Sequence, residues 1–96
     1  MDVEWDENKN RINIAMHGIG FERAARIFDG PTVDRIDDRE DYGEERVISL
    51  GMIEDILILV VVHTDRDGVT RIISAGPAKR SERRIYDREI QNRTDG

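Results

Sequence analysis

Apolar and polar positions along the chain follow two different spacings, and each spacing predicts a different kind of element. In FERAARIF, residues Phe21, Ala24, Ala25 and Phe28 fall on one face of a helix. The run ILILVVV, from Ile56 to Val62, is instead continuous and rich in β-branched residues, which is typical of a buried strand. The complete set of predicted strands is Asp2–Trp5, Thr32–Ile36, Arg46–Met52, Ile56–Thr64 and Val69–Ala75.

Capping and turn residues separate these elements. Asp6 is placed to cap a helix that runs to about Met16 and ends at His17-Gly18, because glycine readily adopts the left-handed conformation. Gly30-Pro31 ends the second helix. Asp67-Gly68 is a hairpin signal, so we expect the strands on either side of it to pair antiparallel.

A third helix is predicted between Pro77 and about Arg93, with Ile85, Tyr86 and Ile90 as a narrow apolar seam. The expected order of elements is therefore βααββββα. The sequence predicts an α+β fold in which an antiparallel sheet carries two N-terminal helices and one C-terminal helix. A length of 96 residues fits a single domain, residues 1–96, with one core.

The composition and the apolar runs exclude several kinds of site and of cellular location. The chain has no cysteine, so it has no disulfide framework and no thiolate zinc site. Its first residues, MDVEWDENKN, show no secretory signal. The longest apolar run is far shorter than the roughly 20 residues that a membrane helix needs. We therefore expect a cytoplasmic protein with no membrane association.

Charge is distributed unevenly between the two ends of the chain. Residues 1–70 carry a net charge of -9, whereas residues 71–96 carry +3. The stretch AKRSERR concentrates the cations Lys79, Arg80, Arg83 and Arg84. Such a cluster indicates a surface for a polyanion or an acidic partner. The alternative is the solvated flank of a helix, which charge alone favours.

Two histidines and one acidic run are the first candidates for chemistry. His17 precedes a glycine at a helix end, where it is either a functional group or a C-terminal cap, and His63 at the end of the central strand is equally ambiguous. The run DRIDDREDYGEE, residues 34–45, lacks the spacing of a calcium-binding EF-hand loop and is typical of a solvated loop. We expect no metal and no cofactor.

The cationic end offers a different chemistry. Arg71 alternates with apolar residues, so its guanidinium faces away from the core, and the last helix adds Lys79, Arg83, Arg84 and Tyr86. If these side chains meet His17, the guanidinium groups bind a phosphodiester while histidine or tyrosine transfers protons. RNA would then supply its own 2′-hydroxyl nucleophile. The alternative is that Arg71 and Arg84 pair with carboxylates such as Glu45 or Glu82.

Several stretches together resemble one family, the BrnT toxins of bacterial type II toxin–antitoxin modules. The resemblance runs from about Glu4 to Ile90 and rests on WDENKNRINIAMHGIGFERAARIFDG, DDREDYGEERVISLG, VVVHT, RIISA and RSERRIY. It implies a compact fold of the RelE type and a ribonuclease that arrests translation. It also implies a BrnA-like ribbon-helix-helix antitoxin as partner, with DNA contacted only through that antitoxin.

The resemblance also assigns residues by position. His17 matches the histidine of the family's Lys-His-Gly, and Arg71 and Ser74 match its R-I-I-S-A segment. The family's last helix is matched by Glu82, Arg84 and Tyr86. The resulting candidates are His17, Arg71, Arg84 and Tyr86 for catalysis, and Ser74, Lys79, Arg80 and Arg83 for substrate binding.

Two positions depart from the family pattern. Met16 stands where the family usually has lysine, and Gly76-Pro77 stands where it usually has Arg-Lys. Both changes remove cations from the expected site, and proline is expected to end the strand early. The alternative function is therefore a weakened or inactive BrnT-like protein that acts mainly by binding its antitoxin in transcriptional autoregulation.

Overall fold

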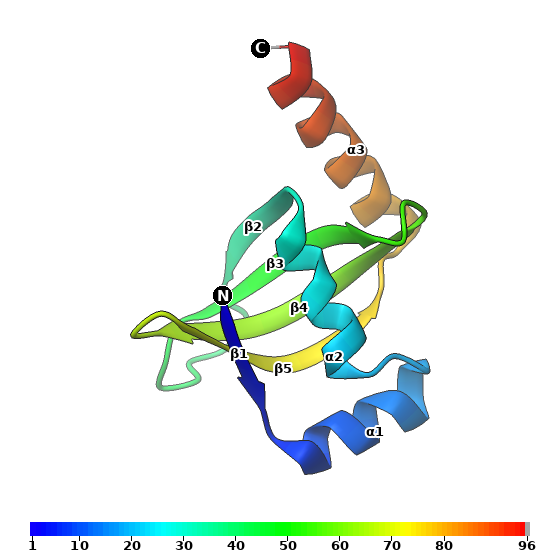
Figure 1. Cartoon of the computed structure of the whole chain (residues 1–96). Helices are drawn as coiled ribbons and strands as arrows, with labels where there is room; N and C mark the ends of the chain where they lie inside the picture. The colour runs from blue at the N-terminus through cyan, green and yellow to red at the C-terminus, as the bar shows by residue number, and fades with distance from the viewer. Residues whose placement is uncertain (96) are drawn as a thin grey trace.

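The computed structural model describes residues 1–95 and shows an α+β fold in which helices pack on a five-stranded sheet (Figure 1). The strands are β1 (Asp2–Trp5), β2 (Thr32–Asp37), β3 (Arg46–Ile53), β4 (Leu57–Arg66) and β5 (Val69–Pro77). The helices are α1 (Glu7–His17), α2 (Phe21–Ala24), the 3₁₀ helix η1 (Ala25–Asp29) and α3 (Arg80–Asp95). Within residues 1–95, no helix is long and apolar enough to span a membrane.

The sheet is mixed, so the expectation of a wholly antiparallel sheet is wrong. The strand order is β1-β5-β4-β3-β2, and the strands from β2 to β5, which follow one another directly in the chain, pair antiparallel. The predicted hairpin is confirmed: Asp67 and Gly68 both have positive φ, at 53° and 80°. β1, in contrast, pairs parallel with β5, and the other three strands and the helices α1, α2 and η1 lie between them in the chain.

β5 is longer than the sequence predicts. The strand does not stop at Ala75, because Gly76 and Pro77 continue the ladder opposite Val60 and Leu59. Ala78 then donates to the carbonyl of Ile58 at 2.9 Å, which places the proline nitrogen on the side facing away from β4. β1 does not reach this part of β5, so the N–H that proline lacks would have had no strand partner.

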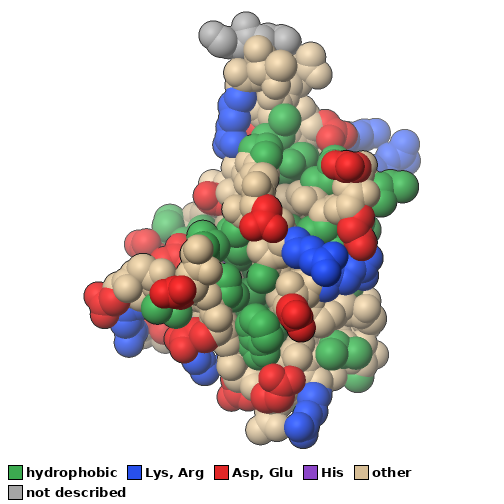
Figure 2. Space-filling model, viewed as in Figure 1, with side chains coloured by type: hydrophobic (Ala, Val, Ile, Leu, Met, Phe, Trp, Pro, Cys, Tyr) green, Lys and Arg blue, Asp and Glu red, His purple; other side chains and the backbone are tan. Residues whose placement is uncertain are grey.

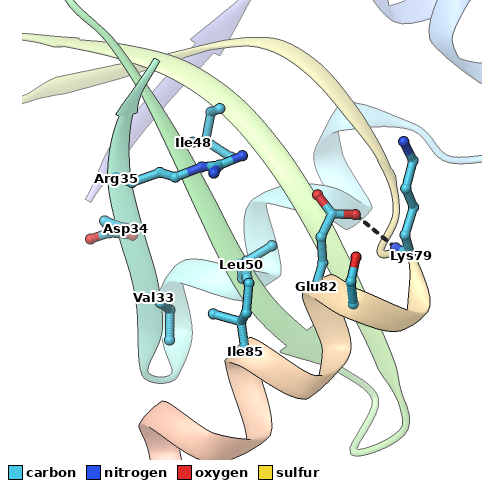
Figure 3. A pocket seen from close by; sticks show the side chains of 9 residues that line it. Val33, Asp34, Arg35, Ile48, Leu50, Lys79, Glu82 and Ile85 are labelled. Atoms are coloured by element: carbon cyan, nitrogen blue, oxygen red, sulfur yellow. Dashed lines mark hydrogen bonds between the residues drawn. The ribbon is translucent and has the colours of Figure 1, made fainter. Parts of the chain in front are cut away.

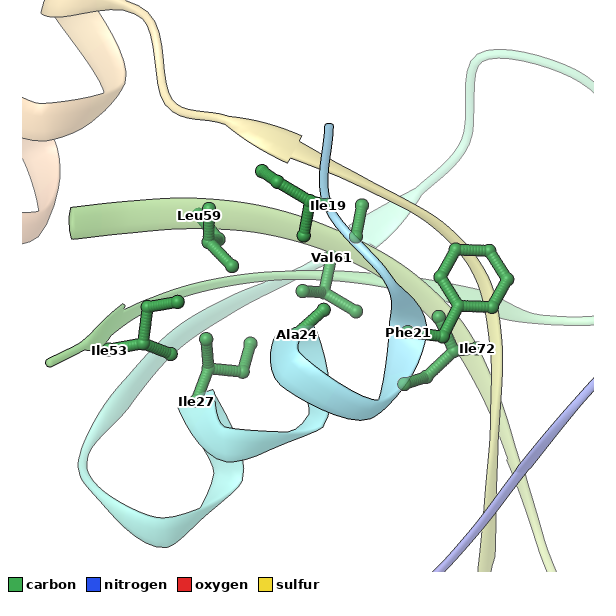
Figure 4. Close-up of a cluster of buried hydrophobic side chains, with 9 residues drawn as sticks. Ile19, Phe21, Ala24, Ile27, Ile53, Leu59, Val61 and Ile72 are labelled. Carbon is green, nitrogen blue, oxygen red and sulfur yellow. The ribbon is translucent and has the colours of Figure 1, made fainter. Parts of the chain in front are cut away.

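The second helix differs from its predicted form. It begins as α2 but continues as the tighter η1, so its buried residues Phe21, Ala24 and Ile27 recur every third position. Ala25 and Phe28, which the helical spacing placed on the buried face, are only partly buried. Figure 4 shows Phe21, Ala24 and Ile27 against the sheet; the full cluster adds Ile19, Ile53, Leu59, Val61, Ile72 and Ala75.

The sheet therefore has two different faces. The covered face lies beneath α2 and η1 and carries this cluster (Figure 4). The opposite, open face is covered only at one end, where α3 brings Tyr86 and Ile90 against Leu50, Ile58 and Ala78. α3 then projects from that end of the sheet (Figure 1). The uncovered part of this face carries Arg71.

Candidate functional site

His17 is held at the edge of β5 by the helix that carries it. Asp6 caps α1 by accepting from the amide of Asn8 at 2.8 Å, and Gly18, with φ of 70°, ends it. One turn before His17, the buried Asn13 donates to the Ala75 carbonyl at 2.7 Å and accepts from the Ala75 amide at 3.1 Å. Asn13 thus takes the place of a neighbouring strand, a role that its position inside a helix did not reveal.

The imidazole of His17 lies next to Gly76. A Cβ added to that glycine would be 3.6 Å from the His17 ring, an ordinary contact distance. Gly76 pairs with Val60 and Ser74 with Val62, so positions 74 and 76 both face the open side of the sheet. His17 is exposed there. The structure therefore brings His17 and Ser74 to the same surface.

Arg71 lies further along the same strand. It is opposite Glu4 in the parallel ladder, and its Nη1 is 3.5 Å from Glu4 Oε1. The two side chains are 47% and 55% exposed, so water screens the pair, and it contributes less than about 1 kcal/mol. Arg71 thus pairs with a carboxylate, as the alternative interpretation of the sequence expected, but the partner is Glu4 and neither Glu45 nor Glu82. Arg71 also lines a hollow of about 320 Å³ with Glu4, Glu44, Thr64, Arg66 and Val69.

The cations of the last helix lie at the other end of β5. Pro77 lies six positions after Arg71, or roughly 20 Å along the strand, and α3 starts three positions later. Lys79, Arg80, Arg83 and Arg84 are exposed there. Arg83 donates to the Ala78 carbonyl at 3.1 Å, and the Arg84 guanidinium has no polar partner among residues 1–95. Arg71 and Arg84 therefore do not converge on one phosphate-sized pocket.

Tyr86 occupies a structural position. Its ring is 5% exposed and packs with Leu50, Ile58 and Ala78, and its hydroxyl donates to the carbonyl of Pro31 at 3.2 Å. Burial raises the pKa of the hydroxyl above its usual value. The side chain is thus part of the contact that holds α3 against the sheet, and it is buried whereas His17 is exposed.

His63 belongs to a polar chain on the covered face. The Ser49 hydroxyl donates to Asp34 Oδ1 at 2.6 Å and contacts His63 Nε2 at 2.7 Å, while His63 Nδ1 is 2.8 Å from Asp65 Oδ1. Phe28 packs edge-on against the imidazole, with ring centroids 5.1 Å apart. Both ring nitrogens of His63 therefore have a polar partner. The sequence showed His63 as ambiguous and gave no sign of Ser49.

The acidic run is divided between a strand and a loop. Residues 34–37 belong to β2, and the buried carboxylate of Asp37 accepts from Arg39 Nε and Nη2, both at 2.7 Å. The hydrogen bonds from the Arg39 guanidinium lower the pKa of Asp37 to about 2. Across residues 1–95, no group of three or more His, Asp or Glu side chains is arranged to hold a metal ion.

A second surface feature was not predicted. Between β2, β3 and the start of α3 lies a cavity of about 280 Å³ on the open face (Figure 3). Arg35 and Lys79 lie at its margin. Lys79 was predicted as a substrate-binding residue, whereas Arg35 was assigned to the acidic run. Only the register that sets Arg35 opposite Ile48 brings its guanidinium to this face.

Comparison with known proteins adds two findings. The family model of the ribonuclease toxin BrnT of type II toxin–antitoxin systems matches residues 5–82. The crystal structure of the Brucella abortus ribonuclease toxin BrnT is similar in fold, with a TM-score of 0.62, 22% sequence identity, and coverage of 83% of this chain and 99% of that chain. No curated protein sequence matches this chain significantly. The family match includes His17, Arg71 and Ser74 but ends before Arg84 and Tyr86.

Proposed function

The chain belongs to the BrnT family of ribonuclease toxins of type II toxin–antitoxin systems, and from this we propose that its open face binds and cleaves single-stranded RNA. The observation that carries the proposal is that Arg71 and Ser74 lie on the open face of β5, where α1 places the exposed His17 ring next to Gly76. All three positions lie inside the range that the family model matches. The acidic remainder of the chain limits nonspecific binding to nucleic acid.

The proposed reaction uses the RNA's own hydroxyl group. The 2′-oxygen attacks the adjacent phosphorus, the bond from phosphorus to the 5′-oxygen breaks, and the products are a 2′,3′-cyclic phosphate and a 5′-hydroxyl. Ser74 lies between Arg71 and Gly76 on β5, so a phosphate above Ser74 is within reach of Arg71 from one side and of His17 from the other. Arg71 leaves Glu4 to stabilise the added negative charge.

His17 is the better supported of the two proton-transfer candidates. It is exposed beside Gly76, two positions from Ser74 on the same face, whereas the Tyr86 hydroxyl is buried and donates to Pro31. An imidazole can take the proton from the 2′-hydroxyl or give one to the leaving oxygen. Lys79, Arg80, Arg83 and Arg84 extend the positive surface beyond the reaction centre and bind flanking phosphates. The mechanism uses neither a metal nor a cofactor.

The test is cleavage of single-stranded RNA by the purified chain in excess EDTA. We expect products that end in 2′,3′-cyclic phosphate, and Arg71→Ala should lower the rate by about 100-fold or more. Arg26→Ala is the matched control, because Arg26 is exposed on η1 at the opposite face. Cleavage that requires added magnesium, or that survives Arg71→Ala, would contradict this mechanism.

The proposal extends to the cellular role. Cleavage of RNA would inhibit translation in the cytoplasm, as in toxins of the RelE type, until a BrnA-like ribbon-helix-helix antitoxin binds the toxin. In this hetero-oligomer the antitoxin contacts DNA, and the toxin contacts DNA only through it. Toxin–antitoxin family membership supports a dedicated antitoxin partner.

A second candidate is a weakened toxin that acts mainly as the antitoxin-binding partner. Met16, 70% exposed, and Gly76 stand where cations are expected, and both positions adjoin His17. A Cβ at Gly76 would lie 3.6 Å from the His17 ring, an ordinary contact distance, so the first side-chain carbon of an arginine would not clash there. If this candidate is correct, Met16→Lys combined with Gly76→Arg should raise RNA cleavage sharply from a low level. Unchanged cleavage in the double variant would argue against a decayed site.

A further inference from the structure

The cavity between the sheet and α3 has apolar walls. Its sides are formed by β2, β3 and the first turns of α3, and its volume is about 280 Å³ (Figure 3). The apolar side chains that line it are Val33, Ile48, Leu50 and Ile85. Ile85 is 37% exposed although it is a large apolar residue on a charged helix. A flat apolar ligand would cover the surface that Ile85 leaves in water.

Arg35 brings an available guanidinium to this cavity. Its side chain extends from β2 across β3, and the guanidinium lies above Ile48 (Figure 3). Arg35 is exposed and has no ion-pair partner among residues 1–95, although the sequence around it is strongly acidic. A planar guanidinium beside an apolar wall can stack on an aromatic ring placed between them.

Glu82 contributes a hydrogen-bond acceptor. Its Oε1 accepts from the backbone amide of Lys79 at 2.8 Å, which fixes the carboxylate at the start of α3 (Figure 3). Oε2 has no hydrogen-bond partner among the described residues. The cavity therefore combines an apolar surface, a stacking cation and one fixed carboxylate oxygen.

We propose that this cavity binds one unpaired base of the RNA strand and selects for an amino group on its edge. The proposal rests on the RNA-binding function proposed above. The base stacks on Arg35 and contacts Ile48 and Ile85, while Glu82 Oε2 accepts from its amino group. Cytosine, adenine and guanine have such a group. Uracil has only a ring N–H between two carbonyl oxygens, which the carboxylate repels.

The charges favour a base over an apolar side chain of a protein partner. A buried apolar side chain would cover the Arg35 guanidinium without supplying a group to pair with it, which is unfavourable. A nucleotide instead offers a π face for the guanidinium and a phosphate for the Lys79 ammonium at the margin. The cavity also lies on the face that carries Arg71, so one strand of RNA can reach both places.

The test measures binding of non-cleavable 2′-O-methyl oligonucleotides by fluorescence anisotropy. The unmodified chain should bind oligo-C about tenfold more tightly than oligo-U. Glu82→Gln should remove most of this difference while keeping the cap to the Lys79 amide. Arg35→Ala should weaken binding of both oligomers by about tenfold. Arg26→Ala and Glu40→Gln, exposed residues outside the cavity, should change neither quantity.

The outcomes separate this proposal from the proposed function. Cleavage of RNA with equal affinity for oligo-C and oligo-U would overturn the base site and leave the ribonuclease in place. A preference for oligo-C that Glu82→Gln abolishes, in a chain that does not cleave RNA, would support the base site alone. If both cavity variants weaken only the complex with the antitoxin, the cavity docks a protein and the proposal is wrong.

Discussion

The two faces of the sheet hold their polar side chains in opposite ways. On the covered face, His63 is 5% exposed and contacts Ser49 and Asp65 at 2.7 and 2.8 Å. On the open face, Arg71 meets Glu4 at 3.5 Å, and both side chains are about half exposed. A buried chain of short hydrogen bonds cannot be broken without leaving polar groups unpaired, whereas an exposed ion pair exchanges easily for another anion. The hydrogen bonds of His63 therefore hold neighbouring strands together, whereas Arg71 is available to bind a ligand.

The surface charge on the covered side of the sheet agrees with a structural role for that side. Figure 2, which views that side, shows acidic and basic side chains next to one another over most of the surface. Such a surface attracts no one class of charged ligand. The uncovered cations of the open face, Arg35 and Arg71 among them, are therefore the better candidates for binding RNA.

The two histidines give the largest contrast between the faces. His63→Leu should lower the free energy of unfolding by about 2 to 3 kcal/mol, because it removes the His63 partner of the buried Ser49 hydroxyl. His17→Leu should change it by less than about 0.5 kcal/mol, because His17 is exposed. Urea unfolding of both variants measures this.

RNA cleavage should respond in the reverse order. His17→Leu should abolish most of the activity, while His63→Leu should retain it wherever the chain remains folded. Loss of activity in a fully folded His63→Leu variant would assign the covered face a catalytic part and break the comparison.

Two glycines, Gly51 on the covered face and Gly76 on the open face, differ in how closely other atoms pack against them. A Cβ at Gly51 would lie 2.5 Å from Ile27 Cβ, so Gly51→Ala should destabilise the fold by about 2 kcal/mol. A Cβ at Gly76 would lie 3.6 Å from His17, so Gly76→Ala should be neutral or slightly stabilising. Thermal melting of the two alanine variants checks this. Equal melting temperatures would mean that η1 shifts freely over the sheet.

Whether a contact of the fold could be predicted from the sequence depends on how far apart its two residues lie along the chain. The Asp67-Gly68 turn and the cap at Asp6 are local, and both were predicted. The parallel pairing of β1 with β5 was not, because Glu4 and Arg71 lie far apart in the sequence and no turn motif joins their strands. For the same reason the sequence left the carboxylate partner of Arg71 open, with Glu45 and Glu82 among the candidates.

The candidate site shows the same limit. His17 and Ser74 were both named, but Asn13, which fixes His17 on β5, was not, since its partner Ala75 is 62 residues away. Tyr86 was correctly placed on the apolar seam of the last helix, and this burial sets it apart from the exposed candidates. The surface at Arg35 depended on a strand register that alternation of residue types does not fix.

Asp37 and Arg39 form a second ion pair on the open face, and low pH should weaken its contribution to stability. The pKa of Asp37 is lowered to about 2, below the usual value near 4, so its contribution to stability is full above pH 4 and is lost as the pH falls toward 2. Asp37→Asn should therefore be less stable than the unmodified chain at pH 7, with a difference that shrinks between pH 4 and pH 2. Urea unfolding across this range measures it. A difference that does not change with pH would mean that the Arg39 contact makes no electrostatic contribution.

The smallest expected effect comes from the ion pair that we propose RNA must displace. Glu4→Gln should change the free energy of unfolding by less than about 0.5 kcal/mol, because Arg71 and Glu4 are both about half exposed. It should also strengthen binding of a non-cleavable oligonucleotide by roughly threefold at low salt, since a carboxylate next to the phosphate is removed. The gain should disappear as the salt concentration rises. Glu40→Gln, which removes a charge from an exposed loop, is the control. Weaker binding in Glu4→Gln would mean that Glu4 positions Arg71 for RNA. The Arg71–Glu4 pair would then be a fixed structural contact, like the His63–Asp65 contact on the covered face, and not one that RNA displaces.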